Sequence, residues 1–337
     1  MSRWRVKWIP ALAAILSAAV WAALAQQAPV IRVDVDLVHV LATVKDPSGA
    51  LVGTLQKDNF EVYDNGVKQE VAVFERRTEQ PLSIALMLDT SGSTGKDLKY
   101  ETDSASRFLQ ALFSEGNPAD AVALYGVNAD VKQFSVFTHN YASLVQRFKL
   151  LQPEGATALY DAIYLASSQD LEKREGRKVI VLVTDGDDTY STWNAHQALE
   201  AAQRADAIIY PVVVVPITND AGRNIGGEHA LIFMAQGTGG RTFLPALGPD
   251  LDKAFVDIIT ELRTQYLLGF YPHNAPPSND RFHTLEVRVN RPELKVSARN
   301  GYYGIAGSEA GASDARVSVA PGNASTSTEK SKPRSKK

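Results

Sequence analysis

The sequence predicts an α/β protein: a doubly wound, mostly parallel sheet with one antiparallel strand, flanked by a small β-sandwich that the N- and C-terminal segments form. Three observations predict it. Strand and helix patterns alternate over residues 81–264. Several strands there, such as residues 179–183, are apolar throughout, which is typical of parallel strands covered on both faces. The flanking segments, 26–80 and 265–304, show the alternating pattern of half-buried strands.

The first 25 residues predict an export signal. Basic residues at the start precede an apolar stretch over residues 8–22, and small residues at 23–25 form a cleavage site before Gln26. We therefore expect residues 1–25 to be a signal peptide and the protein to be periplasmic, cell-envelope associated or secreted. An uncleaved membrane anchor is the alternative, because the stretch is nearly long enough to span a bilayer.

The chain contains no cysteine, which excludes disulfide bonds and thiol catalysis. Its stability must come from core burial and from any metal that it binds. The formal net charge of −3 provides no basic field that would attract nucleic acid. Residues 305–337 are rich in Ser, Ala, Gly and Lys, and we expect them to form a disordered basic tail.

The N-terminal β segment begins with alternating apolar and polar residues over 31–37. At Val38 the apolar positions shift to the even residues Val40, Ala42 and Val44, which predicts a bulge or bend within the strand. The turn at residues 64–66, Asp-Asn-Gly, predicts a hairpin that joins strands 60–63 and 67–74. The C-terminal segment adds strands at 266–271, 282–289 and 294–298. Neither segment has enough strands to bury two faces, so we expect them to pair into one sandwich; two separate β appendages are the alternative.

The central region supplies the parallel sheet. Its predicted strands are residues 82–88, 121–127, 131–137, 178–184 and 208–215, with a short strand near 241–243. Its predicted helices are residues 97–114, 141–151, 158–173, 193–205, 229–236 and 250–262. Three residues separate strands 121–127 and 131–137, and a link this short permits only an antiparallel pair.

A motif with oxygen-bearing side chains follows the first central strand. The run Asp89-Thr90-Ser91-Gly92-Ser93 places one carboxylate and two hydroxyls two residues apart. Mg²⁺ prefers such oxygen ligands, and Mn²⁺ and Ca²⁺ are the alternatives. Two further donors, Thr157 and Asp185, lie where loops of an open α/β sheet converge at the carboxyl edge of the strands. The sequence therefore predicts a divalent-metal site.

On these residues the region 81–264 resembles a von Willebrand factor type A domain. Its Asp-x-Ser-x-Ser run with a distant Thr and Asp is similar to the metal-ion-dependent adhesion site (MIDAS) of that family. The resemblance implies that Ser91, Ser93 and Thr157 reach the cation directly or nearly so, and that Asp89 and Asp185 bind directly or through water. The β flanks resemble bacterial exported proteins related to this domain. One departure is Ala156, where many members have a second glycine.

We expect an exported, non-enzymatic adhesion module whose cation binds an Asp or Glu of a partner protein. Two alternatives stay open: a Mg²⁺-dependent hydrolase that uses Asp187 and Asp188, and a structural envelope protein with a stabilising metal. The simplest non-functional interpretation is that Ser91 and Ser93 cap the following helix and Asp185 is a turn residue. Neither histidine spacing for a metal nor a Gly-x-Ser-x-Gly nucleophile motif is present.

Overall fold

The computed structural model describes residues 37–76, 79–214, 224–275 and 281–304. These residues belong to one compact unit. The predicted signal peptide and basic tail lie outside the described residues. Within the described ranges, none of the helices combines the length and the apolar character needed to cross a membrane.

The central sheet has five strands in the order β7-β6-β5-β8-β9. Their bounds are β5 (Leu82–Asp89), β6 (Ala121–Val127), β7 (Val131–Thr138), β8 (Arg177–Thr184) and β9 (Ala207–Val213). All neighbours are parallel except β6 and β7, which pair antiparallel as their short link predicts. The expected short strand near 241–243 is reduced to a single parallel bridge between Phe243 and Val212.

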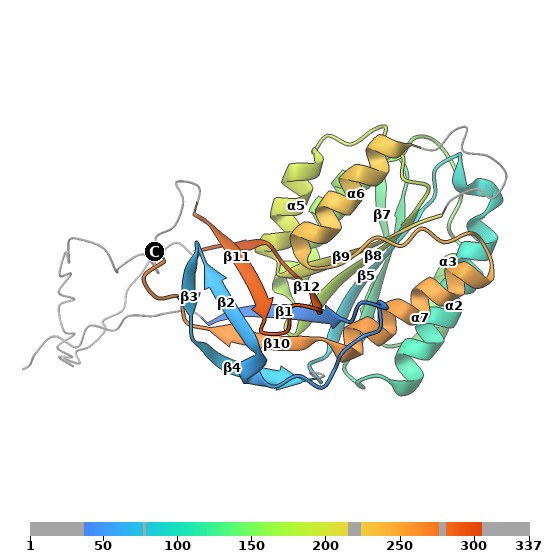
Figure 1. Cartoon of the computed structure of the whole chain (residues 1–337). Helices are drawn as coiled ribbons and strands as arrows, with labels where there is room; N and C mark the ends of the chain where they lie inside the picture. The colour runs from blue at the N-terminus through green and yellow to red at the C-terminus, as the bar shows by residue number, and fades with distance from the viewer. Residues whose placement is uncertain (1–36, 77–78, 215–223, 276–280, 305–337) are drawn as a thin grey trace, which may run out of the picture. The chain divides into compact units, whose positions relative to one another are not determined.

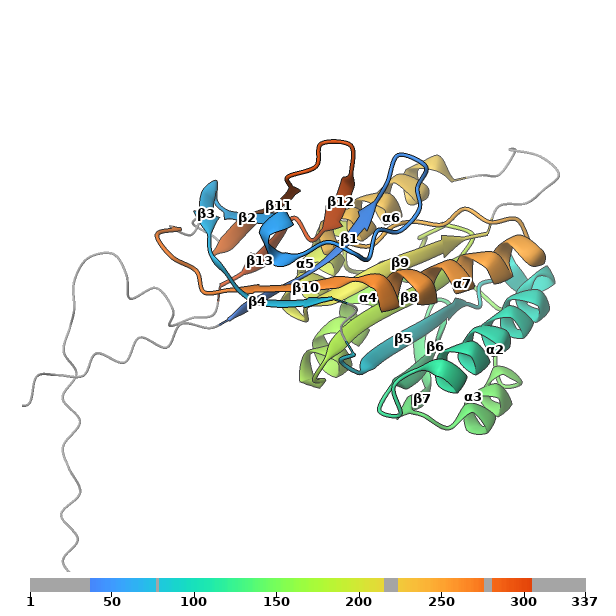
Figure 2. The same ribbon diagram turned by 60° about the horizontal axis from the view of Figure 1, so that its bottom comes forward.

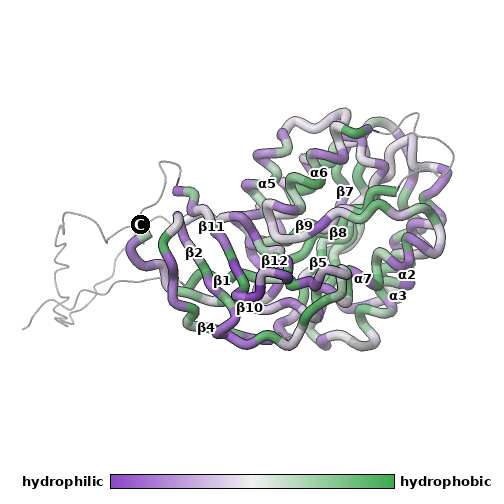
Figure 3. The backbone as a smooth tube through the Cα atoms, in the orientation of Figure 1, coloured by the Kyte–Doolittle hydropathy of each residue, from purple (hydrophilic) through white to green (hydrophobic). Residues whose placement is uncertain are grey.

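Helices cover both faces of this sheet (Figures 1 and 2). One face carries α2 (Leu98–Glu115), α3 (Tyr141–Phe148) and α7 (Pro249–Thr264), and the other carries α4 (Leu159–Leu165), α5 (Ala195–Arg204) and α6 (Ile225–Thr238). Successive side chains of a strand point to opposite faces. In β5, Leu86 and Leu88 therefore enter the first core cluster, while Ala85 and Met87 enter the second. This two-sided burial explains why the central strands are so apolar (Figure 3).

The predicted helix 158–173 is not one regular α-helix. After α4 the chain forms a π-helical segment, Ala166–Asp170, and then a short 3-10 helix, Leu171–Lys173. Asp170, at the end of the π segment, accepts a 2.7 Å hydrogen bond from the hydroxyl of Tyr125 on β6. This contact ties the end of the helical segment to the sheet, which the periodicity of the helix could not show.

Two four-stranded sheets form the β-sandwich, in the orders β12-β1-β10-β4 and β13-β11-β2-β3. The N-terminal strands are β1 (Val38–Lys45), β2 (Phe60–Asp64), β3 (Val67–Gln69) and β4 (Val71–Arg76). The C-terminal strands are β10 (Tyr266–Phe270), β11 (Phe282–Val289), β12 (Lys295–Ala298) and β13 (Gly301–Tyr303). Strand β1 pairs with β10 and β12, and β2 pairs with β11. Both sheets thus combine the two ends of the chain and share one hydrophobic core.

The sandwich differs from the sequence prediction at two places. The expected strand 67–74 is divided into β3 and β4, which belong to different sheets. The buried side chain of Gln69 exchanges hydrogen bonds with the backbone of His273, and the chain changes sheet directly after it. The short strand β13 was not predicted; it is fixed by Tyr302, whose hydroxyl donates a 2.8 Å hydrogen bond to the buried Asp64.

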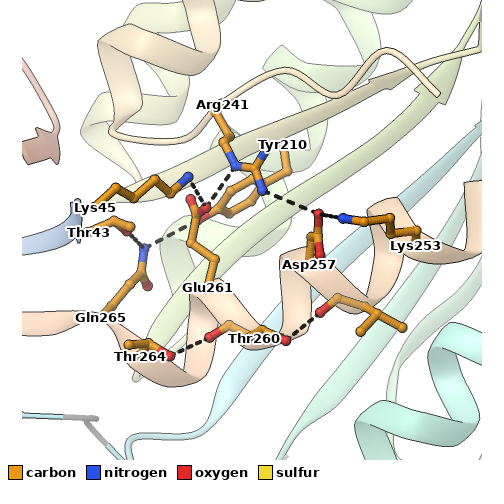
Figure 4. A network of polar contacts seen from close by, with 11 residues as sticks. Thr43, Lys45, Tyr210, Arg241, Lys253, Asp257, Thr260, Glu261, Thr264 and Gln265 are labelled. Atoms are coloured by element: carbon orange, nitrogen blue, oxygen red, sulfur yellow. Dashed lines mark hydrogen bonds and ion pairs between the residues drawn. The ribbon is translucent and has the colours of Figure 1, made fainter. Parts of the chain in front are cut away.

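A buried acidic residue connects the sandwich to the central sheet (Figure 4). Glu261 on α7 binds Lys45 of β1 and Arg241, each at 2.8 Å from its Oε2 atom. The hydroxyl of Tyr210 on β9 lies 3.2 Å from the other carboxylate oxygen. Since Glu261 is only 1% exposed, these three donors supply the partners that a buried carboxylate requires.

Candidate metal centre

The candidate site lies at the carboxyl ends of β5 and β8. These strands are neighbours, although β6 and β7 come between them in the sequence. The strand order therefore reverses here, and open α/β sheets bind ligands at such a switch point. Asp89 is the last residue of β5, and Asp185 directly follows β8. The topology brings the two acidic residues to the same edge of the sheet.

Asp89 is held by hydrogen bonds to both of its carboxylate oxygens. The backbone N–H of Ser91 donates to Oδ1 at 2.9 Å, and the hydroxyl of Thr184 donates to Oδ2 at 2.7 Å. The Thr184 hydroxyl also accepts a 3.0 Å hydrogen bond from the N–H of Gly186. Asp89 is completely buried, so these bonds fix the direction of its carboxylate from the loop after β5 and from the last residue of β8.

Two serine hydroxyls extend from Asp89 toward Asp185. The Oγ atoms of Ser91 and Ser93 are 3.0 Å apart, and Ser93 donates a 2.5 Å hydrogen bond to Oδ2 of Asp185. In an octahedral Mg²⁺ shell with bonds of about 2.1 Å, adjacent ligand oxygens are about 3 Å apart. The serine spacing and the all-oxygen donor set fit such a cation. The side chain of Ser93 does not cap the 3-10 helix that follows it, and the side chain of Asp97 does not cap α2.

Thr157 is attached to the site through its backbone. Its N–H donates to the hydroxyl of Thr189, and its carbonyl oxygen accepts from the N–H groups of Thr189 and Tyr190 at 2.9 Å. The same loop bonds to the Asp89 loop, because Gly92 N–H donates to Gly155 O at 3.1 Å. Within residues 79–214, the hydrogen bonds of Thr157 involve only these backbone atoms. The side chain of Thr157 is buried, and its role as a ligand stays a prediction.

The two aspartates after the motif support neighbouring elements. Oδ1 of Asp188 accepts hydrogen bonds from the N–H of Leu159 at 2.8 Å and from the hydroxyl of Ser191 at 2.6 Å. Asp188 thus satisfies the N-terminus of α4, which follows the Thr157 loop. Burial raises the pKa of Asp188, while these hydrogen bonds oppose the rise. Asp187 accepts a hydrogen bond from Asn224, the N-cap residue of α6.

The site concentrates acidic groups, and among the described residues no basic side chain contributes to the pKa shift of Asp89. Burial raises the pKa of Asp89 to about 6, and the charge of Asp185 adds to the rise. Burial also raises the pKa of Glu101 on α2 to about 8, with further contributions from Asp89, Asp97 and Asp185. A bound cation would favour the ionised forms of these acids. Within the described ranges, no three His, Asp or Glu side chains converge to hold a metal.

The spacing of the motif residues does not single out Thr184 or Glu101. Thr184 is adjacent to Asp185, but only the structure shows that its hydroxyl points across to Asp89. Glu101 left a signal in the sequence. It occupies a position of the apolar stripe of α2, three residues after Leu98 and four before Ala105, both of which are buried. A charged residue on the core face of a helix indicates a special role.

Residues 84–187 match the family model of the von Willebrand factor type A domain. No curated protein matches this chain in sequence.

Similar solved structures, all at low identity, include the vWF domain of the type V pili tip protein Mfa5 from Porphyromonas gingivalis. It is 15% identical with a TM-score of 0.46, and the match covers 54% of this chain and 95% of that one. The BatB protein of Bacteroides thetaiotaomicron is 20% identical with a TM-score of 0.42, over 54% of this chain and 98% of that one. The PilB minor pilin of Streptococcus sanguinis is 14% identical with a TM-score of 0.42, and the match covers 56% of this chain and 62% of that one. The family match, together with the mixed five-stranded sheet, identifies residues 84–187 as part of a von Willebrand factor type A domain.

Proposed function

We propose that this chain is an exported, non-enzymatic protein-binding module that engages its partner through a divalent cation. The cation is Mg²⁺, held by Asp89, Ser91, Ser93, Thr157 and Asp185, with Mn²⁺ and Ca²⁺ as substitutes. A carboxylate from an Asp or Glu of the partner completes the shell. The observation that carries the proposal is the continuous contact from Ser91 through Ser93 to Asp185, which links the loops after β5 and β8.

The charge balance of the donor set supports a cation that still attracts an acid. Two carboxylates, from Asp89 and Asp185, match the charge of a divalent ion, and the three hydroxyls add oxygen without charge. The ion then keeps its affinity for a further carboxylate. Exposure differs across the site: Asp89 is buried, Asp185 is half-buried and Ser93 is exposed. A partner can reach the cation from the side of Ser93.

The positions of Asp187 and Asp188 favour binding over hydrolysis. A hydrolase would need one of them free for acid–base chemistry. Asp188 instead holds the start of α4, and Asp187 holds Asn224. The substitution Asp188→Asn keeps an acceptor oxygen at the cap but removes the acid. We expect it to leave Mg²⁺ affinity and partner binding within about twofold of wild type, with Asp188→Ala as the destabilising comparison at about 1 kcal/mol.

Export is proposed from the first 25 residues, which lie outside the described part of the chain. Fractionation of the cell envelope tests this point. Recovery of the protein with the membranes indicates a retained anchor, and recovery in the soluble fraction indicates a cleaved signal peptide.

The first experiment measures the cation directly. Isothermal titration of the full chain with Mg²⁺ and Mn²⁺ should show one site, which Asp185→Asn and Ser93→Ala weaken by at least tenfold. Circular dichroism in EDTA should show that both variants remain folded. An unchanged affinity for Mg²⁺ in both variants would contradict a cation site at this edge of the sheet.

The second experiment tests the partner chemistry. A peptide array carries Asp- or Glu-containing peptides, each beside the same peptide with Asn or Gln in place of the acid. The protein is applied to the array in Mg²⁺ or in EDTA. We expect binding to acidic members only, in Mg²⁺ only, and no such binding by Asp89→Ala. Equal binding in EDTA would contradict the proposal, as would turnover of phosphoesters that depends on Asp187.

A further inference from the structure

Glu101 is a buried acid on α2, and one oxygen of its carboxyl group is the point of interest. It lies in the first turn of α2 and is 1% exposed. Among the described residues, its Oε2 atom has no hydrogen-bond partner. Burying a carboxyl oxygen without a partner is costly, so natural proteins rarely do so without a function.

The surroundings of Glu101 are acidic. Its charge interactions are with Asp89, Asp97 and Asp185, and all three raise its pKa. The other fully buried glutamate with charged contacts, Glu261, binds two basic side chains instead. Glu101 is thus buried close enough to Asp89 and Asp185, two of the proposed ligands, for their charges to act on its carboxylate.

Ordinary helix capping does not account for Glu101. The N-cap residue of α2 is Asp97, which makes no side-chain cap, and Glu101 contacts it through its own backbone N–H at 3.1 Å. A glutamate that reaches back to cap a helix occupies the third helical position, whereas Glu101 is the fourth. Its carboxyl group is therefore not used by the helix end.

We propose that Glu101 is a further residue of the cation site and binds the cation through water. The proposal rests on the cation of the proposed function. Direct ligation does not fit, because no three acidic side chains in the described ranges converge closely enough to share an ion. Water molecules of a bound Mg²⁺ are strong hydrogen-bond donors, and Mg²⁺ keeps several of them. The free Oε2 atom of Glu101 supplies the acceptor that such a water needs.

This arrangement gives Glu101 a positioning role. Carboxylates that hydrogen-bond to the groups bound directly to a metal ion hold those groups in place. Loss of such a carboxylate lowers metal affinity by about 10- to 100-fold. A third acid also sets a preference for divalent over monovalent ions, because each added negative charge favours the more highly charged ion. The cation in turn offsets the burial of the Glu101 charge.

The test is a titration of the full chain with Mg²⁺ for wild type and Glu101→Gln. We expect the Kd for Mg²⁺ to rise about tenfold in the variant. The midpoint of thermal unfolding in EDTA should not fall, because glutamine keeps the shape of the side chain and removes a buried acid whose Oε2 atom has no partner among the described residues. Glu101→Asp, which retains a carboxylate able to reach through water, should recover part of the affinity.

Two control variants separate this role from general effects. Asp103→Asn removes an exposed charge on the same helix, where Asp103 pairs with Lys99, and should leave the Kd unchanged. Glu261→Gln alters a glutamate of equal burial away from the site, and should lower the unfolding midpoint without changing the Kd. If Glu101 had only a structural role, Glu101→Gln would lower the unfolding midpoint and leave the Kd unchanged, as we expect of Glu261→Gln.

The outcomes distinguish the two proposals. Equal Mg²⁺ affinity of wild type and Glu101→Gln overturns the role of Glu101 and leaves the proposed function intact. A fall in the unfolding midpoint of Glu101→Gln in EDTA also overturns it. Wild type that binds neither Mg²⁺ nor Mn²⁺ overturns the proposed function, and the role of Glu101 with it.

Discussion

Thr184 on β8 donates a 2.7 Å hydrogen bond to Oδ2 of Asp89 on β5. This bond crosses between the two strands at which the sheet order reverses, and it leaves the other oxygen of Asp89 to the backbone of Ser91. A neutral hydroxyl therefore sets the direction of the most deeply buried acid of the site.

Replacing Thr184 tests this relationship. Thr184→Val keeps the shape of the side chain but leaves Oδ2 of the buried Asp89 without its donor. We expect a loss of about 1–3 kcal/mol in the free energy of unfolding and about a tenfold rise in the Kd for Mg²⁺. Urea unfolding in EDTA and calorimetric titration measure the two effects. Thr184→Ser retains the hydroxyl and is the control; if it matches the valine variant, the hydrogen bond is not the cause.

The raised pKa values of the site predict how stability depends on pH without metal. The pKa of Glu101 rises from 4.5 to about 8 and that of Asp89 from 3.8 to about 6, both chiefly through burial. Between pH 4 and 8 the folded state therefore binds more protons than the unfolded state. The contribution of these groups is fully present below about pH 4 and is lost as the pH rises through 6 and then 8.

We expect the free energy of unfolding in EDTA to fall by a few kcal/mol between pH 5 and 9 through these two groups. Excess Mg²⁺ should remove most of the fall. Urea unfolding across this pH range gives the free energy of unfolding of wild type and of Glu101→Gln. Subtracting one from the other cancels the contributions of the other titrating groups. A difference that does not change with pH would contradict the assignment to Glu101.

Gly227 allows α6 to approach the loop that carries Asp185. A Cβ atom at this position would lie 1.9 Å from the carbonyl oxygen of Gly186, so the loop or the helix must shift. Gly227→Ala should lower the free energy of unfolding by about 1–3 kcal/mol and weaken Mg²⁺ binding. Gly226→Ala, whose Cβ meets only the side chain of Asn224, is the matched control. Equal Mg²⁺ affinity in both variants would show that the loop tolerates the shift.

Glu261 stabilises the contact between the sandwich and the central sheet (Figure 4). Glu261→Gln removes the charge that Lys45 and Arg241 share, and both partners retain some solvent exposure. We expect a loss of about 1–3 kcal/mol, below the value for a fully buried pair. The exposed pair of Glu200 and Arg204 provides the control, and Glu200→Gln should cost less than about 0.5 kcal/mol. Equal effects in urea unfolding would show that the Glu261 network adds nothing to stability.

The fold followed from local patterns to a large extent. Continuous apolar runs identified the central strands, and the three-residue link between β6 and β7 determined their antiparallel pairing. The pattern could not show where one strand becomes two, because the sheet change after Gln69 depends on its contact with His273, which is 204 positions away. The π-helical segment after α4 likewise makes a contact with Tyr125 on another element, through Asp170.

The sequence by itself determined which side chains carry oxygen donors and that two of the acids follow parallel strands. Only the tertiary structure decided that Ser93 reaches Asp185, that Thr184 orients Asp89, and that Glu101 is buried where the charges of both acids act on it. The physical reason is that hydrogen-bond direction and burial depend on elements far apart in the chain. Spacing along a sequence records which groups are present, whereas packing determines which of them meet.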